Sequence, residues 1–102
     1  MTETQLSDLK AKHPKGFQLT AGGYELFLKT PARGDYLKFK SMLTGDNMSQ
    51  NSAGEFLLRA CCAHPSLDEL TRILDECPGL PDAVSKHLRR VSGSELEIKL
   101  GE

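Results

Sequence analysis

The residues best suited to metal or covalent chemistry in this chain are its cysteines and histidines. Cys61 and Cys62 precede His64, and Cys77 and His87 lie further along the chain. Thiolates and imidazoles are common Zn²⁺ ligands, and a thiol beside an imidazole is also the pairing that cysteine nucleophiles use. The spacing matches no usual zinc pattern, and no third group stands ready to orient His64. We therefore expect these thiols to pack as small apolar groups, with no metal or cofactor bound.

The pair Gly22-Gly23 is a second pattern that could serve chemistry, since glycine-rich loops can bind phosphate. The strand-glycine-helix order of such loops is missing here, and no lysine and hydroxyl pair follows. A hairpin turn is the better interpretation, because glycine supplies the positive φ angles that tight turns need. With no catalytic constellation in the sequence, we expect neither an enzyme nor a small-molecule substrate.

Composition restricts the class of protein and its partners. The chain has 102 residues and a net charge of −1 with acids and bases interspersed, which predicts one globular domain and argues against nucleic acid or anionic membrane as a partner. No apolar stretch approaches the length of a membrane span, and the polar start lacks the features of a signal peptide. The odd number of cysteines favours reduced thiols. A cytoplasmic protein is expected.

The elements that must position these residues begin with a short, weakly apolar helix over residues 3–12. Residues 1–15 are expected to form a mobile or short-helix segment, and residues 16–102 a single domain. Apolar alternation on either side of Gly22-Gly23 predicts a β-hairpin. Tyr24, Leu26 and Leu28 fall on one face of its second strand and Phe27 on the other, so the hairpin should be covered on both sides.

Helix signals dominate the rest of the chain. Thr30-Pro31 predicts the start of a helix that runs to about residue 43, and residues 44–52 are polar and predict a loop. Further helices are expected over residues 53–63 and from the Ser66 cap to about Cys77. After a break over residues 78–81, a last helix should run through Val84, Leu88 and Val91 and end at Gly93.

The core of this helical part is expected to contain Leu57, Cys61, Leu70, Leu74 and Leu88. The alternating tail over residues 95–100 is strand-like, and it could either add to the hairpin or trail off. The predicted fold class is α+β: an N-terminal β-hairpin, a small three- to four-helix bundle and a candidate C-terminal strand.

Short motifs occur here in an order that is typical of one family. They are the helix start over residues 30–36, the run Phe56-Leu57-Leu58 leading to Cys61-Cys62-Ala63-His64-Pro65-Ser66, the break Pro78-Gly79-Leu80-Pro81, and the ending Val91-Ser92-Gly93. In this order they resemble the tail assembly chaperones of tailed bacteriophages and prophages, over residues 16–100. Cys77 stands where that family has an aromatic residue and Cys62 where it has valine.

The resemblance implies a protein of the bacterial host cytoplasm that binds the tape measure protein and keeps it soluble until the tail tube polymerises around it. It implies no catalytic residues. A tape measure chain is long and helical, with apolar faces that a small domain can shield through its own exposed apolar positions. Some of the following should therefore remain accessible as partner-binding residues: Phe56, Leu58, Leu67, Leu80 and Val84.

Two alternatives to the chaperone interpretation stay open, and so does the oligomeric state. The chain could be a minor structural virion protein, such as a tail or head-completion component, or a small metal-binding or thiol enzyme. A homo-oligomer is compatible with the chaperone interpretation.

Overall fold

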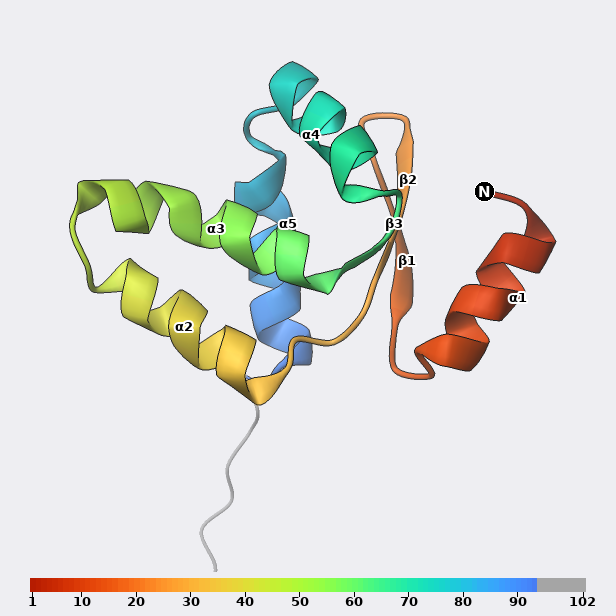
Figure 1. Cartoon of the computed structure of the whole chain (residues 1–102), viewed down its shortest axis with the longest axis horizontal. Coiled ribbons are helices and arrows are strands. Elements are labelled where there is room, and N and C mark those ends of the chain that lie inside the picture. Colours follow the sequence, from red (N-terminus) through yellow and green to blue (C-terminus); the bar gives the residue numbers. More distant parts are fainter. Residues whose placement is uncertain (94–102) are drawn as a thin grey trace, which may run out of the picture.

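A tight β-hairpin lies at the centre of the computed structural model, which describes residues 1–93 (Figure 1). Strand β1 (Phe17–Ala21) pairs antiparallel with β2 (Tyr24–Leu28). Gly22 and Gly23 connect the two strands with φ angles of 58° and 84°, which are the left-handed values that a type I′ turn requires at both central positions. The hairpin turn predicted from this glycine pair is confirmed.

The two faces of β2 are covered by different parts of the chain. Leu26 and Leu28 belong to the main core, whereas Phe27 is equally buried but lies outside that cluster. Phe27 instead packs beside Gly16, and its ring centroid lies 6.5 Å from that of His13. The prediction that the hairpin is covered on both sides is therefore confirmed.

A third strand, β3 (Cys62–His64), completes the sheet in the order β1-β2-β3. It pairs antiparallel with β2, with an irregular register between Phe27 and Leu28. The prediction of a helix over the whole of residues 53–63 is wrong at its C-terminal end, because the last part is extended. The proline that follows His64 disfavours helical geometry there, and pairing with β2 gives the backbone groups of β3 new partners.

Helices α2 (Arg33–Leu43) and α3 (Asn47–Cys61) form a helical hairpin. Helix α3 starts well before residue 53, so the predicted loop over residues 44–52 is wrong except for its first residues. Asp46 caps α3 by accepting a hydrogen bond of 2.8 Å from the Ser49 amide, which also lowers the pKa of the Asp46 carboxyl. The first turns of α3 are polar because they are exposed, and they therefore lack the apolar period that marks a helix.

The start of α2 also differs from the prediction. Its N-cap residue is Ala32, and no side chain caps it. The Thr30 hydroxyl instead donates a hydrogen bond of 3.2 Å to the Lys15 carbonyl oxygen, which ties the segment before α2 to the segment before β1. Thr30 is therefore a tertiary contact and not the predicted cap.

Helices α4 (Leu67–Glu76) and α5 (Leu80–Val91) follow β3. Ser66 accepts a hydrogen bond of 3.3 Å from the Glu69 amide, as expected of the predicted cap. Gly93, with a φ of 95°, lies just beyond the end of α5 at the predicted position. The Tyr24 hydroxyl donates to the Glu76 carboxylate and so links β2 to α4, and this bond raises the pKa of Tyr24.

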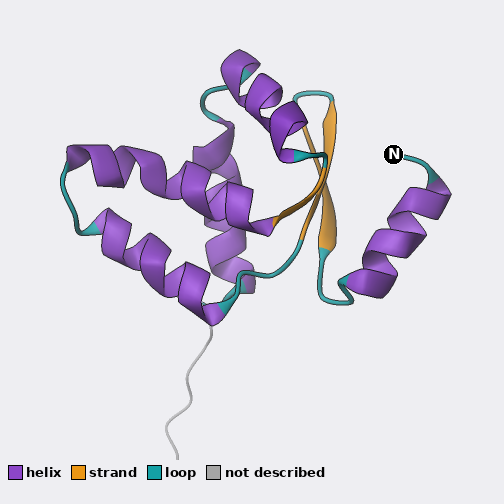
Figure 2. Ribbon diagram, viewed as in Figure 1, coloured by secondary structure: helices purple, strands orange, loops and turns teal. Residues whose placement is uncertain are grey.

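The main core lies between the sheet and helices α2 to α5, on the side of the sheet opposite α1 (Figures 1 and 2). It contains each of the five core residues predicted from the sequence: Leu57, Cys61, Leu70, Leu74 and Leu88. No polar or charged residue among those described in the structure is buried. The core is therefore uniformly apolar, which is the least costly way to fill it.

Helix α1 (Glu3–Lys12) lies apart from this core, on the other side of the sheet (Figure 1). Thr2 and Gln5 form a reciprocal capping box at its N-terminus, and the Met1 amine pairs with the Glu25 carboxylate of β2. None of its residues is buried. The short helix expected over residues 3–12 is present, and it is joined to the sheet mainly through its ends.

These elements give an α+β fold with five helices and a three-stranded antiparallel sheet within residues 1–93. The fold class and the order of hairpin followed by helices are as predicted. Four helices follow the hairpin, and α1 before it brings the total within residues 1–93 to five, one more than the predicted three- to four-helix bundle alone. Strand β3 was not expected. The predicted strand over residues 95–100 lies outside the described residues.

Candidate functional site

Three of the five predicted partner-binding residues are buried. Leu58 is fully enclosed, and Leu80 and Val84 lie on the inner face of α5. Leu80, Val84 and Leu88 are spaced four residues apart, so they fall on one stripe of the helix, and that stripe packs into the core. Leu58, Leu80 and Val84 are therefore not available to a partner, and within the predicted set the accessible members are Phe56 and Leu67.

The other two predicted residues are accessible to different degrees. Leu67, in the first turn of α4, is 51% exposed. Phe56 on α3 is half-buried, and the Lys38 ammonium of α2 lies 4.9 Å from the centroid of its ring. A lysine side chain is flexible, so a partner could displace it from the ring.

Two further apolar side chains are exposed on the α2–α3 hairpin. Met48 is 79% exposed in the first turn of α3, and Leu37 is 53% exposed on α2. Met48 falls within the loop that the sequence predicted over residues 44–52. Leu37 follows Tyr36 directly, and the turn of about 100° between neighbouring helix positions carries it to the outer face. We call Leu37, Met48 and Phe56 together the hairpin apolar surface.

Cys61 and Cys62 sit in surroundings that lower the reactivity of their thiols. Cys61 is fully buried and Cys62 is half-buried. Burial raises the pKa of both thiols to about 11, which keeps them protonated at neutral pH, where a thiol is a weak nucleophile and a poor metal ligand. The Cys62 thiol donates to the Pro65 carbonyl oxygen over 3.4 Å. The prediction that Cys61 packs in the core is confirmed.

Within residues 1–93, no three histidine, cysteine or acidic side chains gather at a point where a metal ion could be held. Across the same residues, no helix combines the length and the apolar character needed to cross a membrane.

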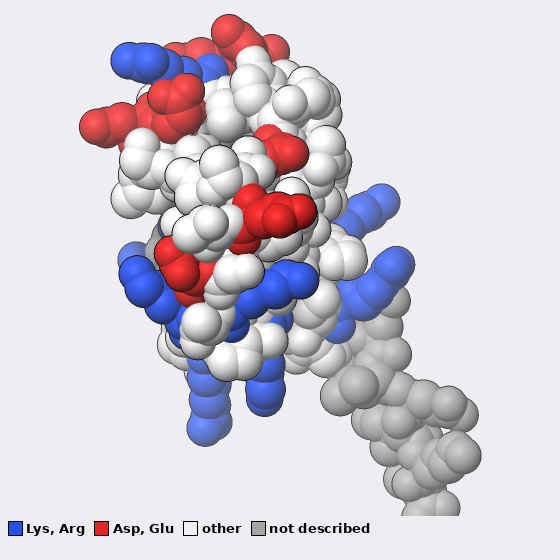
Figure 3. All heavy atoms as spheres, turned by 90° about the vertical axis from the view of Figure 1, so that its right-hand side faces the viewer, with Lys and Arg blue, Asp and Glu red and all other residues white. Residues whose placement is uncertain are grey.

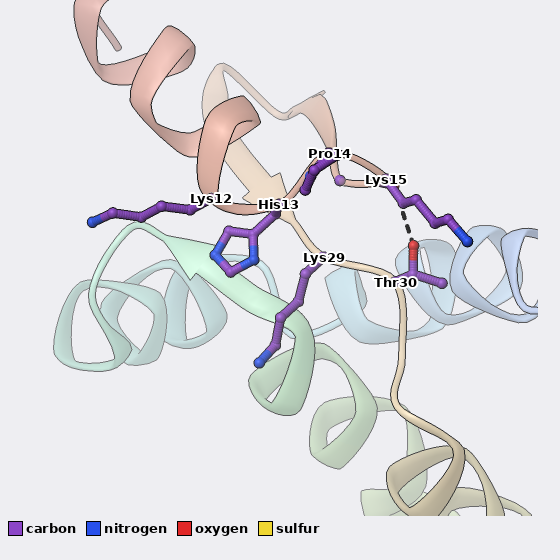
Figure 4. A pocket seen from close by; sticks show the side chains of 7 residues that line it. Lys12, His13, Pro14, Lys15, Lys29 and Thr30 are labelled. Carbon is purple, nitrogen blue, oxygen red and sulfur yellow. Dashed lines mark hydrogen bonds between the residues drawn. The ribbon is translucent and has the colours of Figure 1, made fainter.

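A pocket of about 370 Å³ lies where the end of α1 meets the end of β2 (Figure 4). It is lined by residues 12–16 together with Lys29 and Thr30, and the surface exposed inside it is mainly apolar. Three of the lining residues are lysines, and no acidic residue lines it. No ion pair between the described residues involves Lys12, Lys15 or Lys29.

Hydrogen bonds hold the walls of this pocket in place. The Gly16 amide donates to the His13 carbonyl oxygen over 2.8 Å and closes the turn after α1. Thr30 donates to the Lys15 carbonyl oxygen, and the Lys29 amide donates to the Cys61 carbonyl oxygen over 2.8 Å. The backbone of the pocket is thereby tied to the core, while no ion pair between residues 1–93 holds its lysine side chains.

The surrounding surface is divided by charge. Figure 3 shows the face of the molecule on the α1 side, with basic side chains gathered along its lower part and acidic side chains mostly above them. Nothing in the sequence shows that the hairpin brings Lys29 into the same pocket as Lys12 and Lys15. The pocket could therefore not be found without the fold.

Comparisons with known proteins address the fold. No protein-family model and no curated protein matches this chain. Among solved structures, it is similar to the uncharacterised protein rbstp2171 from Bacillus stearothermophilus, with a TM-score of 0.77 and 20% sequence identity. The similarity covers 94% of this chain and 99% of the other. The two chains share a fold. A shared fold at this identity carries no activity from one protein to the other.

Proposed function

We propose that this chain is a phage or prophage tail assembly chaperone that binds the tape measure protein and keeps it soluble in the host cytoplasm, without catalysis. The observation that carries the proposal is the exposure of Leu37 and Met48 on the helical hairpin that also carries the half-buried Phe56. Exposed apolar groups on neighbouring elements are the usual mark of a surface that meets another chain.

The chemistry of this surface suits a long helical partner. An amphipathic helix can lay its apolar stripe against exposed apolar side chains, which removes both surfaces from water. Met48 adds adaptability, because the flexible thioether of methionine fits partners of different shape. A tape measure chain presents many successive helical segments, so an adaptable contact serves better than a rigid pocket. Leu67 on α4 offers a further apolar position outside the hairpin.

The low reactivity expected of the cysteines also favours a binding role. The pKa of about 11 for Cys61 and Cys62 leaves little thiolate for nucleophilic chemistry at neutral pH. Cys61 and Cys62 therefore give no support to the alternative of a small thiol enzyme.

Co-expression tests the proposal. The tape measure protein from the same genome is produced alone, with this chain, and with a variant that carries Leu37→Ser and Met48→Ser. We expect this chain to raise the soluble fraction of the tape measure protein and to co-purify with it, and the variant to do neither. Both substituted side chains are exposed, so the variant should keep its fold and most of its stability.

A matched control carries Lys40→Ser and Asn51→Ser, two exposed polar positions on the same helices. It should behave as the unmodified chain does. If this chain neither solubilises nor binds the tape measure protein, the chaperone proposal fails. Recovery of the chain from purified virions would instead support the alternative of a minor virion component.

A further inference from the structure

We propose that the pocket between α1 and β2 binds an acidic segment of a polypeptide, with Lys12, Lys15 and Lys29 as the groups that contact its carboxylates. This is a second binding site, distinct from the hairpin apolar surface. It does not depend on the identity of the partner proposed above.

The charge of the lining residues selects the class of ligand. The walls carry three ammonium groups and the imidazole of His13, and no carboxylate. No ion pair between residues 1–93 occupies these lysines, so their charges are available to a ligand. The chain as a whole has a net charge of −1, and it therefore exerts no general attraction on anions. Binding of an acidic ligand must come from this local arrangement.

The directions of the lysine side chains favour an extended ligand over a single small anion. Figure 4 shows Lys12 and Lys15 pointing away from each other, with His13 and Lys29 between them. A phosphate ion needs donors that converge on one point. These ammonium groups instead point in different directions around the pocket, which suits several carboxylates on one extended chain.

The interior of the pocket points to a polypeptide as well. Its exposed surface is mainly apolar, and Pro14 and the methylene groups of the lysines contribute to it. An acidic peptide offers both kinds of contact, since its backbone and apolar side chains can cover this floor while its carboxylates reach the ammonium groups at the rim. The hydrogen bonds at Gly16 and Thr30 hold the floor in place before a ligand arrives.

The test is a titration of the full chain against a fluorescein-labelled peptide of alternating glutamate and alanine, followed by fluorescence anisotropy. The pocket variant carries Lys12→Glu and Lys29→Glu. The control carries Lys10→Glu and Lys40→Glu, which gives the same net charge. Lys10 shares the last turn of α1 with Lys12, so both variants disturb the end of that helix alike, but Lys10 does not line the pocket.

We expect the pocket variant to weaken peptide binding at least about tenfold and the control to weaken it less than about twofold, with affinity falling as salt is raised. A milder pair, Lys12→Gln and Lys29→Gln, should show an intermediate loss, and it serves if the charge reversal disturbs folding. Equal losses in the pocket and control variants would overturn the proposal, as would no binding by the unmodified chain. Displacement of the peptide by inorganic phosphate at similar concentration would also overturn it, because the site would then be one for small anions.

Discussion

The two faces of the sheet are built in different ways. On one face, Leu26 and Leu28 join a continuous apolar core with helices α2 to α5. On the other face, Phe27 packs against the turn at Gly16 and the His13 ring, and α1 on this side has no buried residue of its own. Because closely packed apolar side chains provide most of the free energy of folding, the first face should determine stability. The second face should contribute less to stability, and it carries the charged groups around the pocket.

The largest effect expected from this difference lies in the helical core. Leu57→Ala should lower the free energy of unfolding by about 2 to 5 kcal/mol, because it removes a fully buried side chain and leaves a cavity. Leu37→Ala is the matched control, since it makes the same change at an exposed helical position and should cost less than about 0.5 kcal/mol. Urea denaturation measures both. Equal losses would mean that the core is not where the structure places it.

The second prediction uses the pH dependence of the same core. The pKa of the Cys61 thiol is raised by burial from 9.0 to about 11. Below pH 9 the thiol is neutral in both states and has no effect, whereas between pH 9 and 11 the unfolded state releases the proton and the native state keeps it. Stability should therefore fall over that window, by about 2 to 3 kcal/mol for this thiol.

Other groups titrate in the same range, so the informative quantity is a difference between two proteins. Urea denaturation of the unmodified chain and of Cys61→Ala at a series of pH values should show their stabilities converging as the pH rises from 9 to 11. A constant difference over that window would contradict the account of Cys61.

The third prediction addresses the α1 face. A Cβ atom at Gly16 would lie 2.5 Å from Cε1 of the buried Phe27 ring, so Gly16→Ala should cost about 1 to 3 kcal/mol through steric strain. Gly34→Ala is the control, because nothing lies within 4 Å of its Cβ position in the first turn of α2, and alanine there should stabilise the helix by about 0.5 to 1 kcal/mol. Thermal unfolding should move the two variants in opposite directions. A Gly16→Ala variant with unchanged stability would show that the α1 face accommodates the added methyl group without strain.

Sequence patterns predicted the parts of the fold that depend on local chemistry. The Gly22-Gly23 turn, the Ser66 cap and the helix end near Gly93 each follow from residues that lie close together in the chain. Strand β3 was missed because it is short and is specified by its pairing with β2, which is distant in sequence. The first turns of α3 were missed because exposed polar residues carry no apolar period.

The candidate sites were harder to predict than the core. Leu58 and Val84 were chosen as accessible because the chain is small, yet helix packing buries both. An apolar residue on a helix is exposed or buried according to which stripe it occupies, and that depends on neighbouring elements. The pocket forms because the fold brings Lys12 and Lys29 from distant segments to line one cavity, which the sequence does not reveal.

The most direct test of the central claim compares the two surfaces in one binding experiment. A soluble fragment of the tape measure protein is immobilised, and its retention of the unmodified chain, the variant with Leu37→Ser and Met48→Ser, and the variant with Lys12→Glu and Lys29→Glu is measured at low and high salt. We predict that the unmodified chain is retained at both salt concentrations, since apolar contacts withstand salt. At high salt, the lysine variant should be retained to the same extent as the unmodified chain. The hairpin variant should not be retained at either salt concentration. Full retention of the hairpin variant would contradict the claim that the α2–α3 hairpin holds the partner.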